Sequence, residues 1–340
     1  MNSKIISALK PCDYHKLDDA ANALACGKLV AFPTETVYGL GANALDENAV
    51  KSIFIAKGRP QDNPLIVHVA KKEDIKPLVK AIPDVAKLII EKLMPGPVTI
   101  VLEKSDLVPK IVTAGGDTVA IRIPENEIAR ELIKRAEVPV AAPSANISGR
   151  PSPTKARHVA EDLGNSIEYI IDGGDCRVGL ESTVIDLTVT PPTILRPGGV
   201  THEQLCALIG DVAGYEKDCN DNKAPKSPGM KYKHYAPASL MFVFEGENIE
   251  KEILCRIKSN SGKKIYVITA GNTNYPDAYC INCGVTPEEY SKKLFDALRR
   301  TDEEGAELVL AEFPFKRGGI ATALFNRIYK SCGGNVILCK

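Results

Sequence analysis

The sequence predicts an α/β protein built from two domains. Its 340 residues exceed what one hydrophobic core usually serves. Helix-like and strand-like segments alternate over the first two hundred residues, which predicts a mixed or largely parallel sheet with helices packed on it. A shorter alternation after residue 237 predicts a smaller, doubly wound, Rossmann-like domain. We therefore expect domains at residues 11–205 and 238–340, joined by a segment over residues 206–237.

Local patterns justify the elements of the first domain. Residues 18–27 predict a helix that ends at Gly27, because glycine commonly caps a helix C-terminus. Residues 46–57 carry apolar side chains at helical spacing, among them Val50 and Phe54. Short apolar or alternating runs predict the strands. These strands are expected at residues 29–32, 65–69, 98–102, 118–123, 138–142, 169–172 and 183–187.

The strand expected at residues 118–123 has two unlike faces. Its odd-numbered residues are apolar, whereas Arg122 shares the other face with Thr118 and Ala120. A charge on a strand face must meet water, a partner or a ligand. An edge strand with one face in solvent is the alternative interpretation.

Residues 211–237 show no periodicity, and this length is unusual for a plain connector. The stretch ends with tyrosines, lysines and a histidine between prolines, over residues 227–237. We interpret it as a binding lid rather than as a disordered tether.

The second domain begins after Pro237. Thr286-Pro-Glu-Glu289 forms a capping box that opens a helix, and residues 320–330 predict a second amphipathic helix. The strands are expected at residues 241–245, 264–269, 306–311 and 335–338.

Composition excludes several classes of protein. Forty-three basic and 43 acidic residues give a formal net charge of zero, so long-range electrostatics do not draw the chain to nucleic acid or membrane. An anionic ligand therefore needs a local basic cluster. The first ten residues lack a signal-peptide core, and no run of eighteen apolar residues could span a bilayer. We expect a cytoplasmic protein.

The ten cysteines are expected to be reduced and mostly to fill the core. Cys280-Ile-Asn-Cys283 has the spacing of metal ligands, but a structural zinc site usually needs a second close pair. We therefore expect neither zinc nor redox activity.

Two basic residues flank a glycine at the end of the helix at residues 46–57. Lys57 and Arg59 could complement the helix dipole or bind an anion, and this segment alone does not decide between them. The proline after Arg59 holds it extended, which suits a guanidinium that reaches a phosphate or carboxylate. His68, in the next strand, is more often a core residue than a catalytic one.

Small and hydroxylated residues follow several expected strands. They occur around Ser144 and Ser152, around Ser182 and beside Arg196. Open α/β sheets bind ligands at strand ends, although turn chemistry alone could explain these residues. The glycines of Gly39-Leu-Gly-Ala-Asn-Ala44 fit a dinucleotide-binding pattern only weakly, and no P-loop occurs. Use of ATP would therefore need a non-standard site.

Taken together and in order, these segments resemble the YrdC-like family, specifically its long two-domain threonylcarbamoyl-AMP synthases. The resemblance is strong from residue 11 to about 237 and looser over the second domain, where residues 317–327 carry it. The matching motifs are Phe32-Pro-Thr-Glu-Thr-Val-Tyr-Gly-Leu-Gly41, Lys57-Gly-Arg-Pro60, Asn63-Pro-Leu65 with His68, Arg122-Ile-Pro124, Ala142-Pro-Ser-Ala-Asn146, Ser152, Glu181-Ser-Thr183, Arg196-Pro-Gly198 and residues 227–237.

The resemblance implies a concave cleft on the first domain that holds both substrates. The residues that would contact L-threonine are Thr36, His68, Arg122, Ala142 and Ser182. Those that would contact ATP are Arg59, Asn63, Thr118, Ser144, Ser152, Arg196 and, closing over it from the linker, Tyr235. Lys57 and Arg59 would act catalytically.

The resemblance also implies the reaction and its partners. Threonine, bicarbonate and ATP would give threonylcarbamoyl-AMP and pyrophosphate, for threonylcarbamoyladenosine modification of tRNA next to the anticodon. Mg²⁺ would be carried by the ATP phosphates rather than by protein side chains. We expect a monomer that supplies a tRNA threonylcarbamoyl transferase machinery, with at most weak contact to RNA and none to membranes.

The sequence disfavours three other functions. A non-enzymatic RNA-binding module is disfavoured by zero net charge and by the lack of an RNA-recognition signature. A carbamoyl transferase of the hydrogenase-maturation type would carry paired zinc motifs and an acylphosphatase segment, which this sequence lacks. A nicotinamide-dependent oxidoreductase is disfavoured because the dinucleotide pattern is incomplete.

Overall fold

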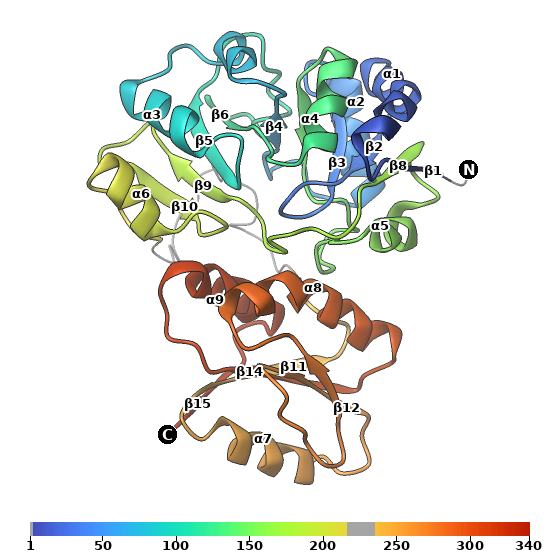
Figure 1. Ribbon diagram of the computed structural model, residues 1–340, viewed down its shortest axis with the longest axis vertical. Coiled ribbons are helices and arrows are strands. Elements are labelled where there is room, and N and C mark those ends of the chain that lie inside the picture. The colour runs from blue at the N-terminus through green and yellow to red at the C-terminus, as the bar shows by residue number, and fades with distance from the viewer. Residues whose placement is uncertain (1–2, 216–234) are drawn as a thin grey trace. The chain divides into compact units, whose positions relative to one another are not determined.

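The structure is a computed structural model that describes residues 3–215 and 235–340 (Figure 1). It divides into two compact units, and we describe each by itself. The first unit comprises Met1–Ser148, Ser152–Arg177 and Glu181–Tyr232. The second comprises Gly149–Pro151, Val178–Leu180 and Lys233–Lys340.

Among the described residues, the first unit is built on a ten-stranded mixed sheet. The strand order is β1-β8-β2-β3-β7-β4-β6-β5-β9-β10, with parallel and antiparallel neighbours. The strands are β1 (Lys4–Ser7), β2 (Val30–Phe32), β3 (Gly39–Asn43), β4 (Ile66–His68), β5 (Val98–Glu103), β6 (Thr118–Arg122), β7 (Val140–Ala142), β8 (Tyr169–Asp172), β9 (Thr183–Asp186) and β10 (Thr193–Arg196).

Helices cover the two faces of this sheet unequally. The helical elements are η1 (Pro11–Leu17), α1 (Asp18–Ala25), α2 (Glu47–Lys57), η2 (Lys72–Leu78), α3 (Asp84–Leu93), α4 (Glu127–Ala136), α5 (Ala156–Leu163) and α6 (His202–Ile209). The larger core packs α2, η2, α3, α5 and α6 against one face. On the other face, α1 and α4 form a core with β2, β7 and β8. Beyond β7, this second face carries a small apolar cluster and a group of buried polar side chains.

Over residues 235–340, the second unit has a five-stranded sheet whose paired strands are all parallel. Its order is β13-β12-β14-β11-β15. The strands are β11 (Leu240–Gly246), β12 (Ile265–Thr269), β13 (Tyr279–Asn282), β14 (Leu308–Phe313) and β15 (Val336–Cys339). Figure 1 shows α8 (Pro287–Glu303) and α9 (Gly319–Ser331) on one face of this sheet and α7 (Ile249–Lys258) on the other. The expected doubly wound domain is confirmed.

Each strand expected from the sequence is present, with ends within two residues of the expected ones. The capping box at Thr286 opens α8 as expected. The sequence analysis missed β1, β3, β10 and β13, as well as α3 to α7. The division between residues 205 and 206 falls within α6. Most of the lid proposed at residues 211–237 lies outside the described residues.

One alternative considered for Arg122 is wrong. Strand β6 is not an edge strand, because it lies between β4 and β5 in the sheet. Arg122 is therefore buried rather than directed into solvent, with 4% of its surface exposed.

The Cys280-Ile-Asn-Cys283 segment spans the end of β13. Cys280 lies within β13 and Cys283 follows it, buried, with the pKa of its thiol raised to about 12 by burial. Over the part of the chain that the structure describes, no three His, Cys, Asp or Glu side chains are grouped to hold a metal ion.

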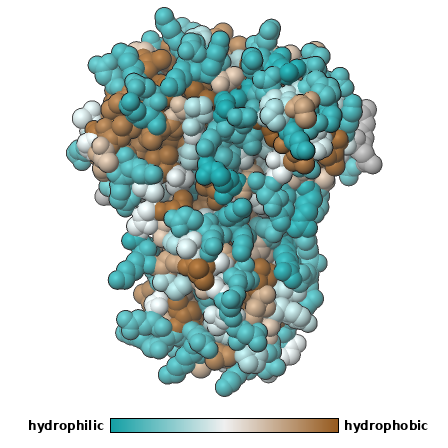
Figure 2. Space-filling view, viewed as in Figure 1, coloured by the Kyte–Doolittle hydropathy of each residue, from teal (hydrophilic) through white to brown (hydrophobic). Residues whose placement is uncertain are grey.

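The face of the protein that Figure 2 shows is largely hydrophilic. In Figure 2, apolar residues gather on the side of the first unit where α3 lies, within a surface that is otherwise mostly teal. In residues 3–215 and 235–340, no helix is both long enough and apolar enough to cross a membrane.

Candidate active site

Four polar residues, His68, Arg122, Thr99 and Arg196, form a row across the second face of the first unit, with Val184 between the last two. Strand register pairs His68 of β4 with Arg122 of β6, and Val184 of β9 with both Thr99 of β5 and Arg196 of β10. Continuing the β5–β6 register by one residue places Thr99 opposite Arg122. Because alternate residues of a strand share a face, the row lies on the same side as the apolar cluster formed by Ile66, Val101, Ala120 and Val184. Thr118 also lies on this face, as the sequence analysis predicted.

Arg122 forms a buried ion pair with Glu35. Its Nη2 donates to Glu35 Oε1 at 2.7 Å, and Glu35 Oε2 accepts from the Glu125 amide at 3.0 Å. Burial opposes ionisation of Glu35, but Arg122 outweighs it, so the pKa of this carboxyl lies below its ordinary value. Arg122 Nε is buried without a hydrogen-bond partner among the described residues. The guanidinium is thus held in place while one donor stays free for a ligand.

His68 is a neutral imidazole beside this ion pair. Its Nδ1 lies 3.2 Å from the Ile66 carbonyl oxygen, and its ring meets Phe32 edge-on. Burial, reinforced by the charge of Arg122, lowers the pKa of His68 to about 3. The ring can therefore exchange hydrogen bonds with a substrate without adding charge.

The low pKa of His68 predicts an acid-sensitive fold. In the unfolded chain His68 binds a proton below the ordinary pKa of histidine. In the folded protein the imidazole stays unprotonated until the pH falls to about 3. The free energy of unfolding should therefore drop by about 1.4 kcal/mol per pH unit across that window from this group alone. His68→Asn keeps a polar side chain but removes the titration. Chemical denaturation between pH 7 and pH 4.5 should give a shallower slope for this variant, and parallel slopes would contradict the argument.

Ser182 connects two members of the row, Thr99 and Arg196. Arg196 donates through Nε and Nη2 to the Ser182 carbonyl oxygen at 3.1 and 3.0 Å, and through Nη2 to Ser182 Oγ at 3.1 Å. Thr99 Oγ1 lies 2.8 Å from the same Ser182 Oγ. A residue predicted to bind threonine and a residue predicted to bind ATP are therefore in direct contact.

The end of α2 positions two basic residues, Lys57 and Arg59. Asp46 caps its N-terminus, and Gly58 ends it in the left-handed conformation at φ 60°, a turn that favours glycine. Arg59 then turns back, and its Nη2 donates to the carbonyl oxygens of Asn63 and Pro64 at 3.3 and 3.2 Å. Asn63 Oδ1 is buried and accepts no hydrogen bond from the described residues.

Lys57 holds the loop that carries Ser144. Its ammonium donates to the Ser144 carbonyl oxygen at 2.5 Å, to the Asn146 carbonyl oxygen and to Asn146 Oδ1 at 3.4 Å. Ser144 Oγ in turn donates to Asn146 Oδ1 at 2.5 Å. The structure therefore shows Lys57 fixing the geometry of this loop, and a direct catalytic role for it stays a prediction.

The other predicted site residues lie as follows. Thr36 follows β2 and exchanges a hydrogen bond with Thr34 at 2.8 Å, and Ala142 ends β7. Ser152 Oγ donates to Glu181 Oε1 at 2.7 Å. Tyr235 belongs to the second unit, where its ring stacks on Phe295. Its contact with ATP stays a prediction.

Sequence reasoning missed three residues of this cluster. Glu35 and Glu181 stand inside motifs that were recognised, but nothing local shows that their carboxylates are buried and bonded to Arg122 and Ser152. Thr99 stands in an apolar run of sequence, and its partner Ser182 is 83 residues away along the chain. No local pattern therefore indicates that Thr99 belongs to the site.

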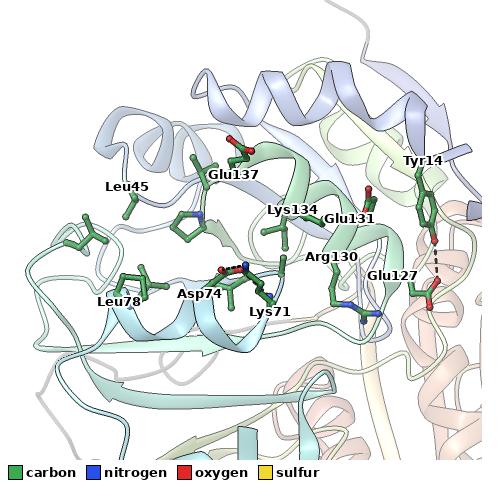
Figure 3. A pocket seen from close by; sticks show the side chains of 17 residues that line it. Tyr14, Leu45, Lys71, Asp74, Leu78, Glu127, Arg130, Glu131, Lys134 and Glu137 are labelled. Atoms are coloured by element: carbon green, nitrogen blue, oxygen red, sulfur yellow. Dashed lines mark hydrogen bonds and ion pairs between the residues drawn. The ribbon is translucent and has the colours of Figure 1, made fainter. Parts of the chain in front are cut away.

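A separate groove of about 740 Å³ lies between η2 and α4. Figure 3 shows charged residues at its rim, with Lys71 next to Asp74 and Tyr14 next to Glu127. None of the predicted site residues lines it. The groove is therefore distinct from the buried polar row.

Comparison with known proteins identifies the family. The model Sua5_yciO_yrdC, described as telomere recombination, matches residues 22–198, and the C-terminal domain of threonylcarbamoyl-AMP synthase matches residues 200–333. Threonylcarbamoyl-AMP synthase of Pyrococcus abyssi is 49% identical over 98% of both chains. Its Bacillus subtilis counterpart is 43% identical over 95% of this chain and 94% of its own.

A solved structure shows the same fold. Sua5 of P. abyssi complexed with L-threonine matches with a TM-score of 0.95 at 48% identity, covering 99% of this chain and 100% of that one. Both domains and nearly the full length are therefore shared with these relatives. The chain belongs to the family of two-domain threonylcarbamoyl-AMP synthases.

Proposed function

We propose that the buried polar row of the first unit binds L-threonine and ATP and joins them through bicarbonate into threonylcarbamoyl-AMP, with release of pyrophosphate. The observation that carries this proposal is the row itself. It places the predicted threonine residues His68 and Arg122 on the same sheet face as Arg196, which is predicted to bind ATP. Buried charges collected on one face of a sheet are costly to the fold and typical of functional sites.

Arg122 suits the carboxylate of the amino acid. A guanidinium binds carboxylates through charge-assisted hydrogen bonds, and Glu35 holds this one so that its Nε remains available. The neutral ring of His68, next to Arg122 in register, can accept a hydrogen bond from the substrate or donate one to it. Thr36 and Ala142 would complete the threonine site.

The chemistry needs alignment and charge neutralisation. The threonine amine adds to carbon dioxide derived from bicarbonate and loses a proton, which gives an N-carboxylate. That carboxylate attacks the α-phosphorus of ATP, and pyrophosphate leaves as the phosphoanhydride bond breaks. Arg59 and Arg196 would offset the negative charge that gathers as these anions meet. Lys57 would support them by holding the loop of Ser144, and alignment can remove roughly 7–11 kcal/mol from such a barrier.

We propose that Mg²⁺ accompanies ATP and is held by its phosphate oxygens. The buried carboxylates of Glu35 and Glu181 are committed to protein partners, Glu35 to Arg122 and Glu181 to Ser152. They are therefore poor candidates for metal ligands. Bound to the triphosphate, Mg²⁺ would neutralise charge on the leaving pyrophosphate.

The product fits the family's role in tRNA modification. We propose that a tRNA threonylcarbamoyl transferase machinery consumes the adenylate, and that the protein works as a cytoplasmic monomer. Pyrophosphate release from ATP that requires both threonine and bicarbonate tests the activity directly. An RNA-binding module without enzymatic function would release none.

Removing the charge of Arg59 should abolish the reaction. We expect Arg59→Ala to lower pyrophosphate release by about a hundredfold or more, because an uncompensated phosphate charge costs several kcal/mol at an enclosed site. The melting temperature should stay within a few degrees of the wild type. Arg177→Ala is the matched control, since Arg177 is exposed and pairs only with Glu125 among the described residues. Turnover like the wild type in Arg59→Ala would reject its assigned role.

A further inference from the structure

Thr99 is the one member of the polar row that no motif pointed to. It lies on β5 between its register partners, with Arg122 on one side and the segment that begins at Ser182 on the other. Its side chain is wholly buried, and its hydroxyl has one hydrogen-bond partner among the described residues, Ser182 Oγ at 2.8 Å. Thr99 thus connects the two ends of the row.

The protons of this hydroxyl pair can be counted. Each hydroxyl carries one proton and can accept two hydrogen bonds. Arg196 Nη2, which is a donor only, already fills one acceptor position of Ser182 Oγ. Thr99 and Ser182 use one proton between them, so one proton of the pair remains without an acceptor. A buried donor without an acceptor is costly, which makes the leftover proton a place for a ligand oxygen.

Either hydroxyl can be the donor of this pair, and the leftover proton belongs to Ser182 when Thr99 is the donor. If Thr99 donates to Ser182, both acceptor positions of Ser182 Oγ are filled, by Thr99 and by Arg196. Ser182 can then only donate, and its partner must be an acceptor oxygen rather than an ammonium group. Arg122, opposite Thr99 in register, attracts a carboxylate to this part of the face.

We propose that Thr99 is a positioning residue that fixes Ser182 as a hydrogen-bond donor to the carboxylate of the amino-acid substrate. This inference rests on the proposed function of the site. Ser182 has no exposed surface in this structure, as is also true of Thr36, so the groups covering them must move when substrate enters. Once the carboxylate is bound, Thr99 donates to Ser182 and Ser182 donates to the carboxylate. In such a series of hydrogen bonds each one strengthens the next.

The variant Thr99→Val tests the proposal, because valine keeps the shape and removes the hydroxyl. Without Thr99, Ser182 regains a free acceptor position and its proton is no longer directed to the substrate. We expect the KM for threonine to rise about fivefold to tenfold, while the KM for ATP stays within twofold. Thr99→Ser, which restores the hydroxyl, should return the threonine KM to within about twofold of the wild type.

A double-mutant cycle shows whether Thr99 acts through Ser182. In a Ser182→Ala background, Thr99→Val should add no further increase in the threonine KM. Thr301→Val is the matched control, since Thr301 is wholly buried in the second unit and donates to the Leu298 carbonyl oxygen. It should lower the melting temperature without changing either KM.

The outcomes separate this inference from the proposed function. If the wild type releases pyrophosphate with threonine and Thr99→Val leaves the threonine KM unchanged, Thr99 has no positioning role. Equal increases in both KM values, or an undiminished effect in the Ser182→Ala background, would also overturn the inference. If Thr99→Val does not fold, Thr99→Ala is measured in the same way. A wild type without threonine-dependent release rejects the function itself.

Discussion

Replacing Arg122 with methionine should abolish threonine-dependent pyrophosphate release and also destabilise the fold. Activity should fall by about a hundredfold or more, because the proposed site loses its carboxylate clamp. The free energy of unfolding should fall by about 3–5 kcal/mol, because Glu35 stays behind as a buried charge without its partner. Steady-state kinetics and chemical denaturation measure the two effects separately.

A double variant distinguishes function from stability. Glu35→Gln with Arg122→Met removes both charges of the buried pair, so no uncompensated charge remains. Most of the lost stability should return, whereas activity should stay absent. Recovery of activity in the double variant would show that Arg122 serves only to balance Glu35.

The stability cost of Arg122→Met should depend on pH. In the wild type the pKa of Glu35 is lowered, so its contribution to stability is present above the unfolded pKa and is lost as pH falls through the lower folded value. In Arg122→Met the Glu125 amide still donates to Glu35, but burial is the largest remaining influence and raises the pKa of this carboxyl, so protonation relieves the buried charge as pH falls. The stability difference between the two proteins should therefore narrow from pH 7 towards pH 4.

The sequence predicted the fold well where local patterns are strong. The alternation over residues 118–123 correctly placed Thr118 and Arg122 on one face, and the capping box at Thr286 correctly marked the start of α8. It predicted poorly where an element is short and its neighbours are distant. Strand β3 (Gly39–Asn43) contains two glycines, and at Gly41 an added Cβ would lie 2.7 Å from Val140. Only this tertiary contact explains why position 41 is a glycine.

The site could be predicted as a set of motifs but not as a connected network. Arg122, Ser182 and Arg196 were identified through the family resemblance, which orders motifs along the chain. Their contacts depend on strand order and register, which place β6, β5, β9 and β10 side by side. The roles of Thr99 and Glu35 can be recognised only in that arrangement, because each contacts a residue more than eighty positions away along the chain.

The turn after Arg196 predicts the second large effect. Gly198 packs so closely on the segment around Ser182 that an added Cβ would lie 2.2 Å from the Thr183 nitrogen, 2.3 Å from the Ser182 carbonyl carbon and 2.4 Å from the Glu181 oxygen. These are backbone atoms at the start of β9 and in the loop before it, so no side chain can rotate away to make room. Gly198→Ala must therefore displace the turn itself.

That displacement should reach Arg196 and its three hydrogen bonds to Ser182. A shift of about 1 Å in a positioned group can cost a hundredfold in rate, and we expect at least that loss in Gly198→Ala, with about 1–3 kcal/mol lost in stability from overpacking. Gly214→Ala is the matched control, because nothing lies within 4 Å of a Cβ built at Gly214. If Gly198→Ala kept the wild-type kcat and both KM values, then the turn would tolerate displacement and the contact between Arg196 and Ser182 would not govern catalysis. A loss confined to Gly198→Ala, with Gly214→Ala unaffected, would instead assign the effect to the close approach of these two backbone segments.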